Sequence, residues 1–441
     1  MRIGILGAGL SGLSLAYFLE RNSSVSRIEL IEKEKTTGGL CRSFSIEGFP
    51  YDIGPHIIFS KDQETLGLMT GLLGDNIVKI RRSNKILYKG RLVKYPFENE
   101  LSALPDEDKR YCLHSFIHNP YERYKPETML QFFLATFGEG ITNCYLRPYN
   151  EKIWKFDPAF MGTQMVERIP KPPPEDIIKS AEGVPTEGYT HQLYFHYPRE
   201  GGIASLVRSL QEEFGPKTAI RLDAAVSRVE REQRGWKIVD SRGTESVHER
   251  LVSTIPLPEL ARVLAPALPA GVGEAIGGLR YNSIILCAMK FSKDRIGDNF
   301  AVMVPDKEAL FHRVSKLDFL KGDGAAGSEG STVLAEITFR PGDLIGAMTD
   351  EDIRSRVLED LVRVGFIERE AECLAAQVRR FPYAYVIYDL DHRRNMKTIR
   401  EYLEGELGLV LCGRFGEFEY LNMDAVISNA RGKAALVAGE A

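Results

Sequence analysis

The chain lacks the features that would place it in a membrane or on nucleic acid. Its 441 residues carry 57 Lys and Arg against 61 Asp and Glu, so its net charge of -4 does not attract polyanions in bulk. No apolar run approaches the roughly twenty residues that span a bilayer. The chain opens directly on a predicted strand without a signal peptide, and we therefore expect a cytoplasmic protein.

Paired short cysteine spacings are also absent. The six cysteines are widely scattered, which argues against a zinc site, an iron–sulfur site or a redox dithiol. We expect reduced, mostly buried thiols and no metal. The chain is longer than a single core usually allows, so two or three lobes are expected.

What the chain does have, at its N-terminus, is an apolar strand followed by a glycine-rich turn and a helical pattern. The turn runs from Gly7 to Gly12, directly after Ile3–Leu6. Gly7 would allow the tight turn, Gly9 would let backbone approach a pyrophosphate, and Gly12 would let helix and strand pack closely. The first amides of the helix would face the phosphates. The pattern predicts dinucleotide binding.

An acid follows at the end of the second predicted strand. Glu32 lies twenty residues after Gly12 and ends an apolar run. Its carboxylate can accept hydrogen bonds from both ribose hydroxyls and would repel a 2′-phosphate. A loop that is glycine-rich for steric reasons alone is the alternative, but the strand, the helix and the acid all fall where a dinucleotide needs them.

Two later segments have similar chemistry. Gly54 and Pro55 fix extended backbone before His56, which can hold that side chain close to a flat ligand; an ordinary core histidine is the alternative. Near the C-terminus, a short buried strand leads through Gly413 into a helix, again an arrangement that can cradle an anion. The alternative there is a simple capping helix.

These segments together resemble the FAD-binding half of the superfamily of amine oxidases, protoporphyrinogen oxidases and UDP-galactopyranose mutases. Gly54-Pro55-His56-Ile57 and the run from Gly413 to Asp424 resemble the mutases in particular. The resemblance implies an α/β fold: a Rossmann-type FAD-binding domain of the glutathione-reductase/amine-oxidase kind, with a helical insertion and an α+β substrate domain built on an antiparallel sheet. It implies FAD-binding parts at 1–80, 196–275 and 406–441, a helical substrate insertion at 81–195, and the substrate-domain sheet and helices at 276–405.

The implied cofactor is FAD. The residues that would contact it are Gly7, Gly9, Leu10, Ser11, Gly12, Glu32, Lys33, Gly39, Leu40, Arg42, Gly54, Pro55, His56, Val226, Thr254, Gly413, Arg414, Asn422 and Met423.

On the substrate side, the run from Tyr149 to Trp154 resembles the Tyr-x-x-Lys-x-Trp stretch of the mutases. By that resemblance His56 would steer the flavin face, and an aromatic wall would hold the substrate; its residues would be Trp154, Tyr189, Tyr385 and Tyr420. Two mutase arginines that grip the substrate diphosphate are replaced here, one by Lys171-Pro172 and one by Tyr385. A lysine offers a point charge without the bidentate fork of arginine.

Three functions stay open. The mutase-like hypothesis is an enzyme acting on a nucleotide-linked sugar through reduced flavin, and the Gly-Pro-His and Gly-Arg motifs favour it. The second is an oxidase or dehydrogenase resembling protoporphyrinogen or amine oxidases, favoured by the missing arginines. The third is a FAD-holding scaffold. The expected partner is a small molecule, with an external reductant or electron acceptor as a further candidate and no nucleic acid.

Some predictions concern local structure. The stretch from Arg81 to Phe97 is basic and aromatic, which suits either a nucleotide or phosphate site or a solvated face. We expect long strands at Leu279–Lys290 and Thr332–Thr338, and helices at Asp350–Val364 and Arg369–Ala376.

Overall fold

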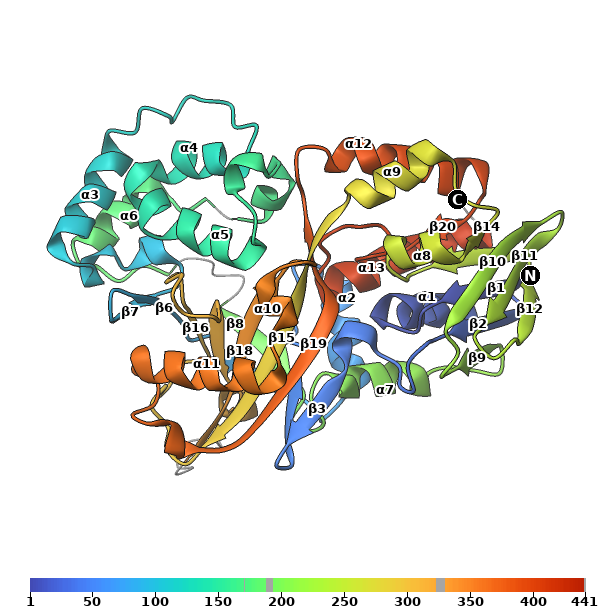
Figure 1. Ribbon diagram of the computed structural model, residues 1–441, viewed down its shortest axis with the longest axis horizontal. Coiled ribbons are helices and arrows are strands. Elements are labelled where there is room, and N and C mark those ends of the chain that lie inside the picture. The colour runs from blue at the N-terminus through green and yellow to red at the C-terminus, as the bar shows by residue number, and fades with distance from the viewer. Residues whose placement is uncertain (170, 188–192, 323–329, 440–441) are drawn as a thin grey trace.

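The computed structural model describes residues 1–169, 171–187, 193–322 and 330–439, and two large sheets organise them (Figure 1). The first is parallel, and its strands come from the two ends and the middle of the chain. Its order is β20 (Val410–Leu411), β13 (Arg250–Ser253), β1 (Arg2–Leu6), β2 (Arg27–Ile31) and β9 (Thr218–Arg221). The central strand β1 is buried over Ile3–Leu6, as a parallel strand covered on both faces requires.

Helices cover this sheet. The N-terminal helix α1 (Leu10–Glu20) packs against the C-terminal helix α13 (Met423–Ala438), and both contribute to one apolar core. The other two helices of this core are α2 (Gln63–Leu73) and α7 (Ala204–Glu212). Both ends of the described chain therefore lie in the same half of the molecule, where Figure 1 shows the two termini close together.

A small four-stranded sheet borders the parallel one. Its order is β12 (Glu245–His248), β11 (Gly235–Asp240), β10 (Val226–Glu232) and β14 (Leu264–Ala265). The helix α8 (Leu257–Val263) contacts β10, α9 (Ala270–Gly278) packs against α8, and α12 (His392–Arg400) packs against α9 (Figure 1). The short hairpin of β3 (Ser43–Ile46) and β4 (Phe49–Asp52) leads from the parallel sheet toward the second half of the molecule.

The second large sheet has seven strands and is mostly antiparallel. Its order is β19 (Cys373–Ile387), β15 (Arg280–Phe291), β18 (Ser331–Phe339), β17 (Arg313–Lys316), β16 (Ala301–Met303), β6 (Asn84–Tyr88) and β7 (Arg91–Lys94). The predicted strands at 279–290 and 332–338 are therefore confirmed. The sheet also takes in the hairpin β6–β7, which lies within the stretch 81–195, because β6 pairs with β16.

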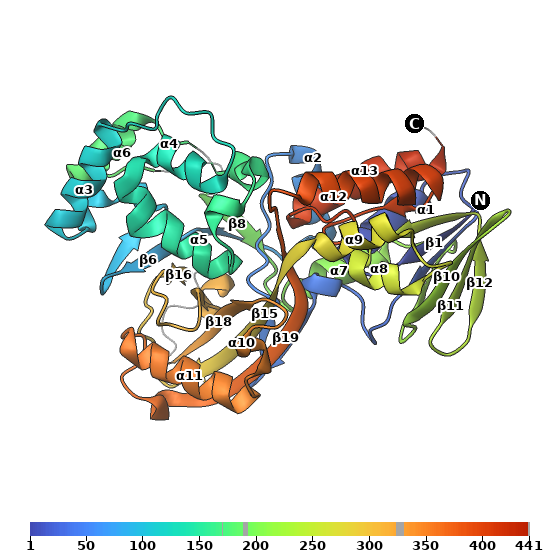
Figure 2. The same cartoon turned by 45° about the horizontal axis from the view of Figure 1, so that its top comes forward.

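Helices lie on two sides of this sheet. α10 (Leu344–Ala347) and α11 (Asp350–Arg363) lie beside the long strands β15 and β19. The group at upper left in Figures 1 and 2 contains α3 (Asp106–Ile117), α4 (Met129–Ile141), α5 (Arg147–Trp154) and α6 (Pro174–Ala181). The strands β5 (Val78–Arg81) and β8 (Tyr194–Tyr197) form a separate two-stranded antiparallel sheet.

The prediction of a helix at Arg369–Ala376 is wrong. A single 3-10 turn at Glu370–Glu372 is followed by β19, which pairs with β15 from Cys373 onward. Hydrogen bonding along a twelve-residue neighbour outweighs the helical apolar spacing of the segment. The remaining architecture agrees with the α/β class predicted from the sequence. Among the described residues, no helix has the length and apolar character needed to cross a membrane.

Candidate functional site

The glycine-rich turn joins β1 to α1 in the geometry predicted for a dinucleotide site. Gly7 has a φ of 93°, which only glycine adopts readily. A Cβ atom at Gly12 would overlap the carbonyl oxygen of Gly7, so the helix can pack this closely on the strand only without a side chain. Gly9 is the N-cap of α1 and supplies no side-chain hydrogen bond, which leaves the first amides of Leu10, Ser11 and Gly12 without a capping side chain.

A second glycine closes over this turn. Gly39 has a φ of 56°, and a Cβ atom on it would lie 3.0 Å from the Cα of Gly9. Leu40 follows it in a 3-10 turn, and Arg42 donates from Nε to the Gly39 carbonyl at 2.9 Å. The Arg42 guanidinium is also paired with Glu34 at 3.3 Å. The two turns thus approach each other as bare backbone.

The Glu32 carboxylate is buried and already has partners. Its Oε2 accepts from the Ala8 amide at 2.8 Å, and its Oε1 accepts from the Glu34 amide at 2.9 Å. Each carboxylate oxygen has two lone pairs and can therefore accept a second hydrogen bond. These backbone bonds do not test the contact with ribose, which stays a prediction. The neighbouring Lys33 is exposed.

The C-terminal turn lies directly on the N-terminal one. Gly413 has a φ of 86°, and a Cβ atom there would overlap Oγ of Ser11. Arg414 donates to the carbonyl of Leu421 at 2.8 Å and to that of Ala384 in β19 at 3.1 Å. Asn422 is the N-cap of α13 and Met423 is its first, buried residue. Arg414 therefore ties the C-terminal turn to the seven-stranded sheet.

Two further residues predicted at the cofactor lie on the same sheets. The Thr254 hydroxyl donates to the Leu6 carbonyl at 2.8 Å, immediately before Gly7. Val226 begins β10 and is half-buried, opposite Asp240. Thr254 thus follows β13 of the parallel sheet, whereas Val226 belongs to the four-stranded sheet.

The Gly54–His56 segment carries a neutral histidine. Nδ1 of His56 lies 2.9 Å from the Gly54 carbonyl, so Nδ1 holds the proton and Nε2 is left as an acceptor. Burial, together with the positive charges of Arg414 and Arg313, lowers the pKa of His56 to about 4. Pro55, between Gly54 and His56, is half-buried.

Three of the four aromatic residues predicted for the substrate wall pack together. The rings of Tyr385 and Tyr420 stack at 5.9 Å with an interplanar angle of 19°. The ring of Trp154 meets both edge-on, at 5.9 and 6.0 Å. The Arg414 guanidinium lies 4.7 Å from the centroid of the Tyr420 ring. We call Trp154, Tyr385 and Tyr420 the aromatic wall; the fourth residue, Tyr189, lies outside the described residues.

An ion pair that sequence reasoning missed lies beneath this site. Arg313 and Glu336 are cross-strand partners in β17 and β18, and the guanidinium donates twice to the carboxylate. A Cβ atom at Gly54 would lie 3.0 Å from Oε1 of Glu336, which explains why a glycine precedes Pro55. Burial, followed by the Glu336 charge, raises the pKa of Tyr385, so that hydroxyl stays protonated. A single acid inside the apolar run Val333–Ile337 was the available signal.

Neither replaced arginine position offers a cation to the aromatic wall. Tyr385 forms part of the wall itself. The Lys171 ammonium lies 5.3 Å from the ring centroid of Phe132 in α4, among the insertion helices.

The sequence profile described as flavin containing amine oxidoreductase matches residues 10–437. A crystal structure of reduced UDP-galactopyranose mutase superposes with a TM-score of 0.87 at 22% identity, covering 100% of this chain and 96% of that one.

Several curated relatives carry porphyrinogen oxidase names, and two of them follow. The coproporphyrinogen III oxidase of Staphylococcus aureus is 20% identical over 435 residues, covering 91% of each chain. The protoporphyrinogen oxidase of Dictyostelium discoideum is 21% identical over 379 residues, covering 70% of each.

The residues present fit a flavin dinucleotide. The uncapped amides of α1 can donate hydrogen bonds to a pyrophosphate, and the bare backbone at Gly9, Gly39 and Gly413 allows the close approach that such a group needs. The cofactor is FAD. The profile match over nearly the whole chain, on top of this cradle, shows that the protein belongs to the flavin-containing amine oxidoreductase family.

Proposed function

We propose that the protein is a FAD-dependent enzyme of the UDP-galactopyranose mutase type, which acts on a nucleotide-linked sugar while its flavin is reduced. In this proposal the stretches 1–80, 196–275 and 406–441 hold the flavin, and 81–195 and 276–405 form the substrate side. The observation that carries the proposal is the aromatic wall and its link through Arg414 to the C-terminal turn.

The wall suits a sugar. Aromatic faces pack against the C–H groups of a pyranose ring, and phenolic hydroxyls donate to its oxygens. The Tyr385 hydroxyl stays protonated because burial raises its pKa. His56 is neutral near pH 7, so its Nε2 can accept a hydrogen bond from a substrate hydroxyl.

The covalent chemistry would come from the cofactor. Bound and reduced, the flavin would supply the nucleophilic chemistry needed at the anomeric carbon. The work of the protein residues is then to orient the sugar and to keep water away. The wall would position the ring, and Arg414 would hold the C-terminal turn against β19 through its bond to Ala384.

A second candidate is an oxidoreductase acting on a porphyrinogen. The names of the two curated relatives favour it, as do the replacements at Lys171-Pro172 and Tyr385. In that case the aromatic wall would pack against a tetrapyrrole instead of a sugar.

A substrate screen separates the two candidates. The holoprotein, with its flavin reduced by dithionite, is incubated with UDP-, GDP- and dTDP-sugars, and ring isomers are resolved by chromatography. In parallel, oxygen consumption is followed with porphyrinogens and amines. Ring isomers formed only by reduced protein support the mutase proposal, whereas turnover by the oxidised protein supports the oxidoreductase. Bound FAD without either activity would indicate a scaffold.

A further inference from the structure

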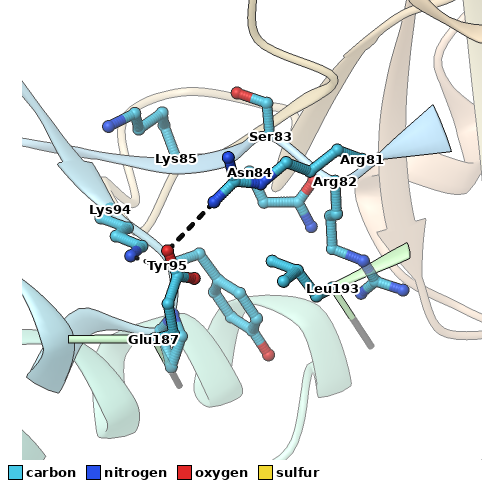
Figure 3. Close-up of a pocket in the computed structure, with 10 residues that line it drawn as sticks. Arg81, Arg82, Ser83, Asn84, Lys85, Lys94, Tyr95, Glu187 and Leu193 are labelled. Carbon is cyan, nitrogen blue, oxygen red and sulfur yellow. Dashed lines mark hydrogen bonds and ion pairs between the residues drawn. The ribbon is translucent and has the colours of Figure 1, made fainter. Parts of the chain in front are cut away.

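A basic pocket opens where the β5–β8 pair meets the hairpin β6–β7. It has a volume of about 300 Å³, and its lining includes Arg81, Arg82, Asn84, Lys85, Lys94 and Tyr95 (Figure 3). This is the basic and aromatic stretch for which the sequence leaves a phosphate site and a solvated face as alternatives. Arg81, Arg82, Lys85, Lys94 and Tyr95 of this stretch line one cavity, whereas Lys89 pairs with Asp108 away from it.

Positive charge exceeds negative charge in this pocket. Four cations lie in its lining, and two carboxylates pair with them. Arg81 lies 3.1 Å from Glu187, Lys94 lies 3.5 Å from the same carboxylate, and Lys85 lies 3.9 Å from Glu100. An anion that entered the pocket would therefore meet a net positive charge.

Glu187 occupies the point on which two of these cations converge. Its Oε1 accepts from Arg81 and its Oε2 faces Lys94, as Figure 3 shows. Lys94 is held in place by a second bond, from Nζ to the Thr186 carbonyl at 2.7 Å. A phosphate oxygen accepts from arginine and lysine in the same geometry as a carboxylate.

One residue of the pocket lining contacts the segment that follows His56. The guanidinium of Arg82 lies 5.5 Å from the ring of Phe59, three residues after His56. Its backbone amide donates to the Leu193 carbonyl at 2.8 Å, and β8 then pairs with Ile58 through His196. The Arg82 side of the pocket is therefore packed against the chain that continues from His56.

We propose that this pocket binds the diphosphate of the nucleotide-linked substrate, and that the Glu187 carboxylate holds the anion position in the free protein. The inference rests on the proposed function, because it assigns the phosphates of that substrate. Arg81 and Lys94 supply the positive charge that the mutase arginines would have given at Lys171-Pro172 and Tyr385. Substrate phosphate then competes with Glu187 for these two cations.

Binding of inorganic pyrophosphate and of UDP to the oxidised holoprotein, measured by titration calorimetry, tests the assignment. Arg81→Ala and Lys94→Ala should each weaken both probes about tenfold, because each removes a charge-assisted hydrogen bond. Glu187→Gln should tighten binding several-fold, because it removes the competing negative charge. Lys79→Ala removes an exposed cation of the same strand outside the pocket and should leave both affinities unchanged.

The cation variants are expected to weaken binding of the probes, and Glu187→Gln is expected to tighten it. Equal affinities in wild type and the two cation variants, weaker binding in Glu187→Gln, or no binding of either probe by the wild-type protein would each overturn the inference. A UDP affinity well above that of pyrophosphate indicates a nucleotide as the source of the diphosphate, and equal affinities indicate the free anion and contradict the substrate role.

The proposed function is tested separately, by chromatographic detection of ring isomers of the sugar nucleotides. If the wild-type protein forms ring isomers but the pocket variants bind pyrophosphate and UDP as the wild type does, this inference is wrong and the proposed function stands. Probe affinities that depend on the pocket, without any isomer, would support the anion site and remove the proposed function.

Discussion

Gly413 and Ser11 meet at a point with no room for another atom, since a Cβ on Gly413 would overlap the Ser11 hydroxyl oxygen. The two residues belong to opposite ends of the chain. One follows β20, and the other lies in the first turn of α1. The C-terminal turn thus completes the cradle that the N-terminal turn begins.

Gly413→Ala should destabilise this cradle. The substitution places a Cβ at a φ of 86° and against Ser11, and the backbone term alone costs roughly 1–2 kcal/mol. We expect a lower melting temperature and partial loss of bound flavin, measured by thermal unfolding and visible absorbance. Gly432→Ala is the control: it adds a methyl in open space on α13 and should stabilise the helix by about 0.5–1 kcal/mol. Equal behaviour of the two variants would contradict the packing described.

Gly9→Val should remove the flavin and spare the fold. A Cβ at Gly9 would meet the Cα and the amide nitrogen of Gly39 at ordinary distances of 3.7 and 3.9 Å, and the φ of -74° suits any residue. The added side chain would instead occupy the approach of the pyrophosphate. We expect folded, colourless protein by circular dichroism and visible absorbance. A variant that stays yellow would mean that the cofactor is placed wrongly.

Much of this cradle can be predicted from the sequence, because each part is local: strand, glycine turn and helix follow one another within a few residues. The parts that could not be predicted depend on distant partners. β19 forms where helical spacing predicts a helix, because β15 is its partner. The Arg313–Glu336 pair joins two strands across a loop, and only the isolated acid in an apolar run marks it. The sequence likewise gives no sign that Glu32 accepts backbone hydrogen bonds from Ala8 and Glu34.

Glu336→Gln should cost roughly 3 kcal/mol of unfolding free energy, because it leaves the Arg313 charge without its partner next to Gly54. Denaturant unfolding measures the loss. The double variant Arg313→Met/Glu336→Met should recover part of it, since the lone charge is then gone. Glu230→Gln breaks the exposed pair with Arg228 and serves as the control, with an expected cost below about 1 kcal/mol. A cost for Glu336→Gln as small as that of the control would refute a buried pair.

His56 should make the protein less stable as pH falls from about 6.5 to 4. Its pKa is about 4 in the folded chain, against 6.5 ordinarily, so the unfolded chain binds the extra proton in this range. Asp52 acts in the opposite direction, because burial raises its pKa to about 6. The test is therefore the difference in unfolding free energy between wild type and His56→Asn, which should shrink by about 1–3 kcal/mol between pH 7 and pH 4. Parallel curves would show that His56 does not titrate in this way.

The central claim is that a sugar nucleotide is rearranged without net oxidation, and the number of product molecules per flavin tests it most directly. Under anaerobic conditions the flavin of the holoprotein is reduced with two electrons per flavin, and an excess of UDP-, GDP- or dTDP-sugar is added. The account predicts many ring-isomer molecules per flavin, with the flavin still reduced when the substrate is exhausted. Failure to form a ring isomer from any of these sugars, together with reduction of the oxidised flavin by a porphyrinogen or an amine, would contradict it.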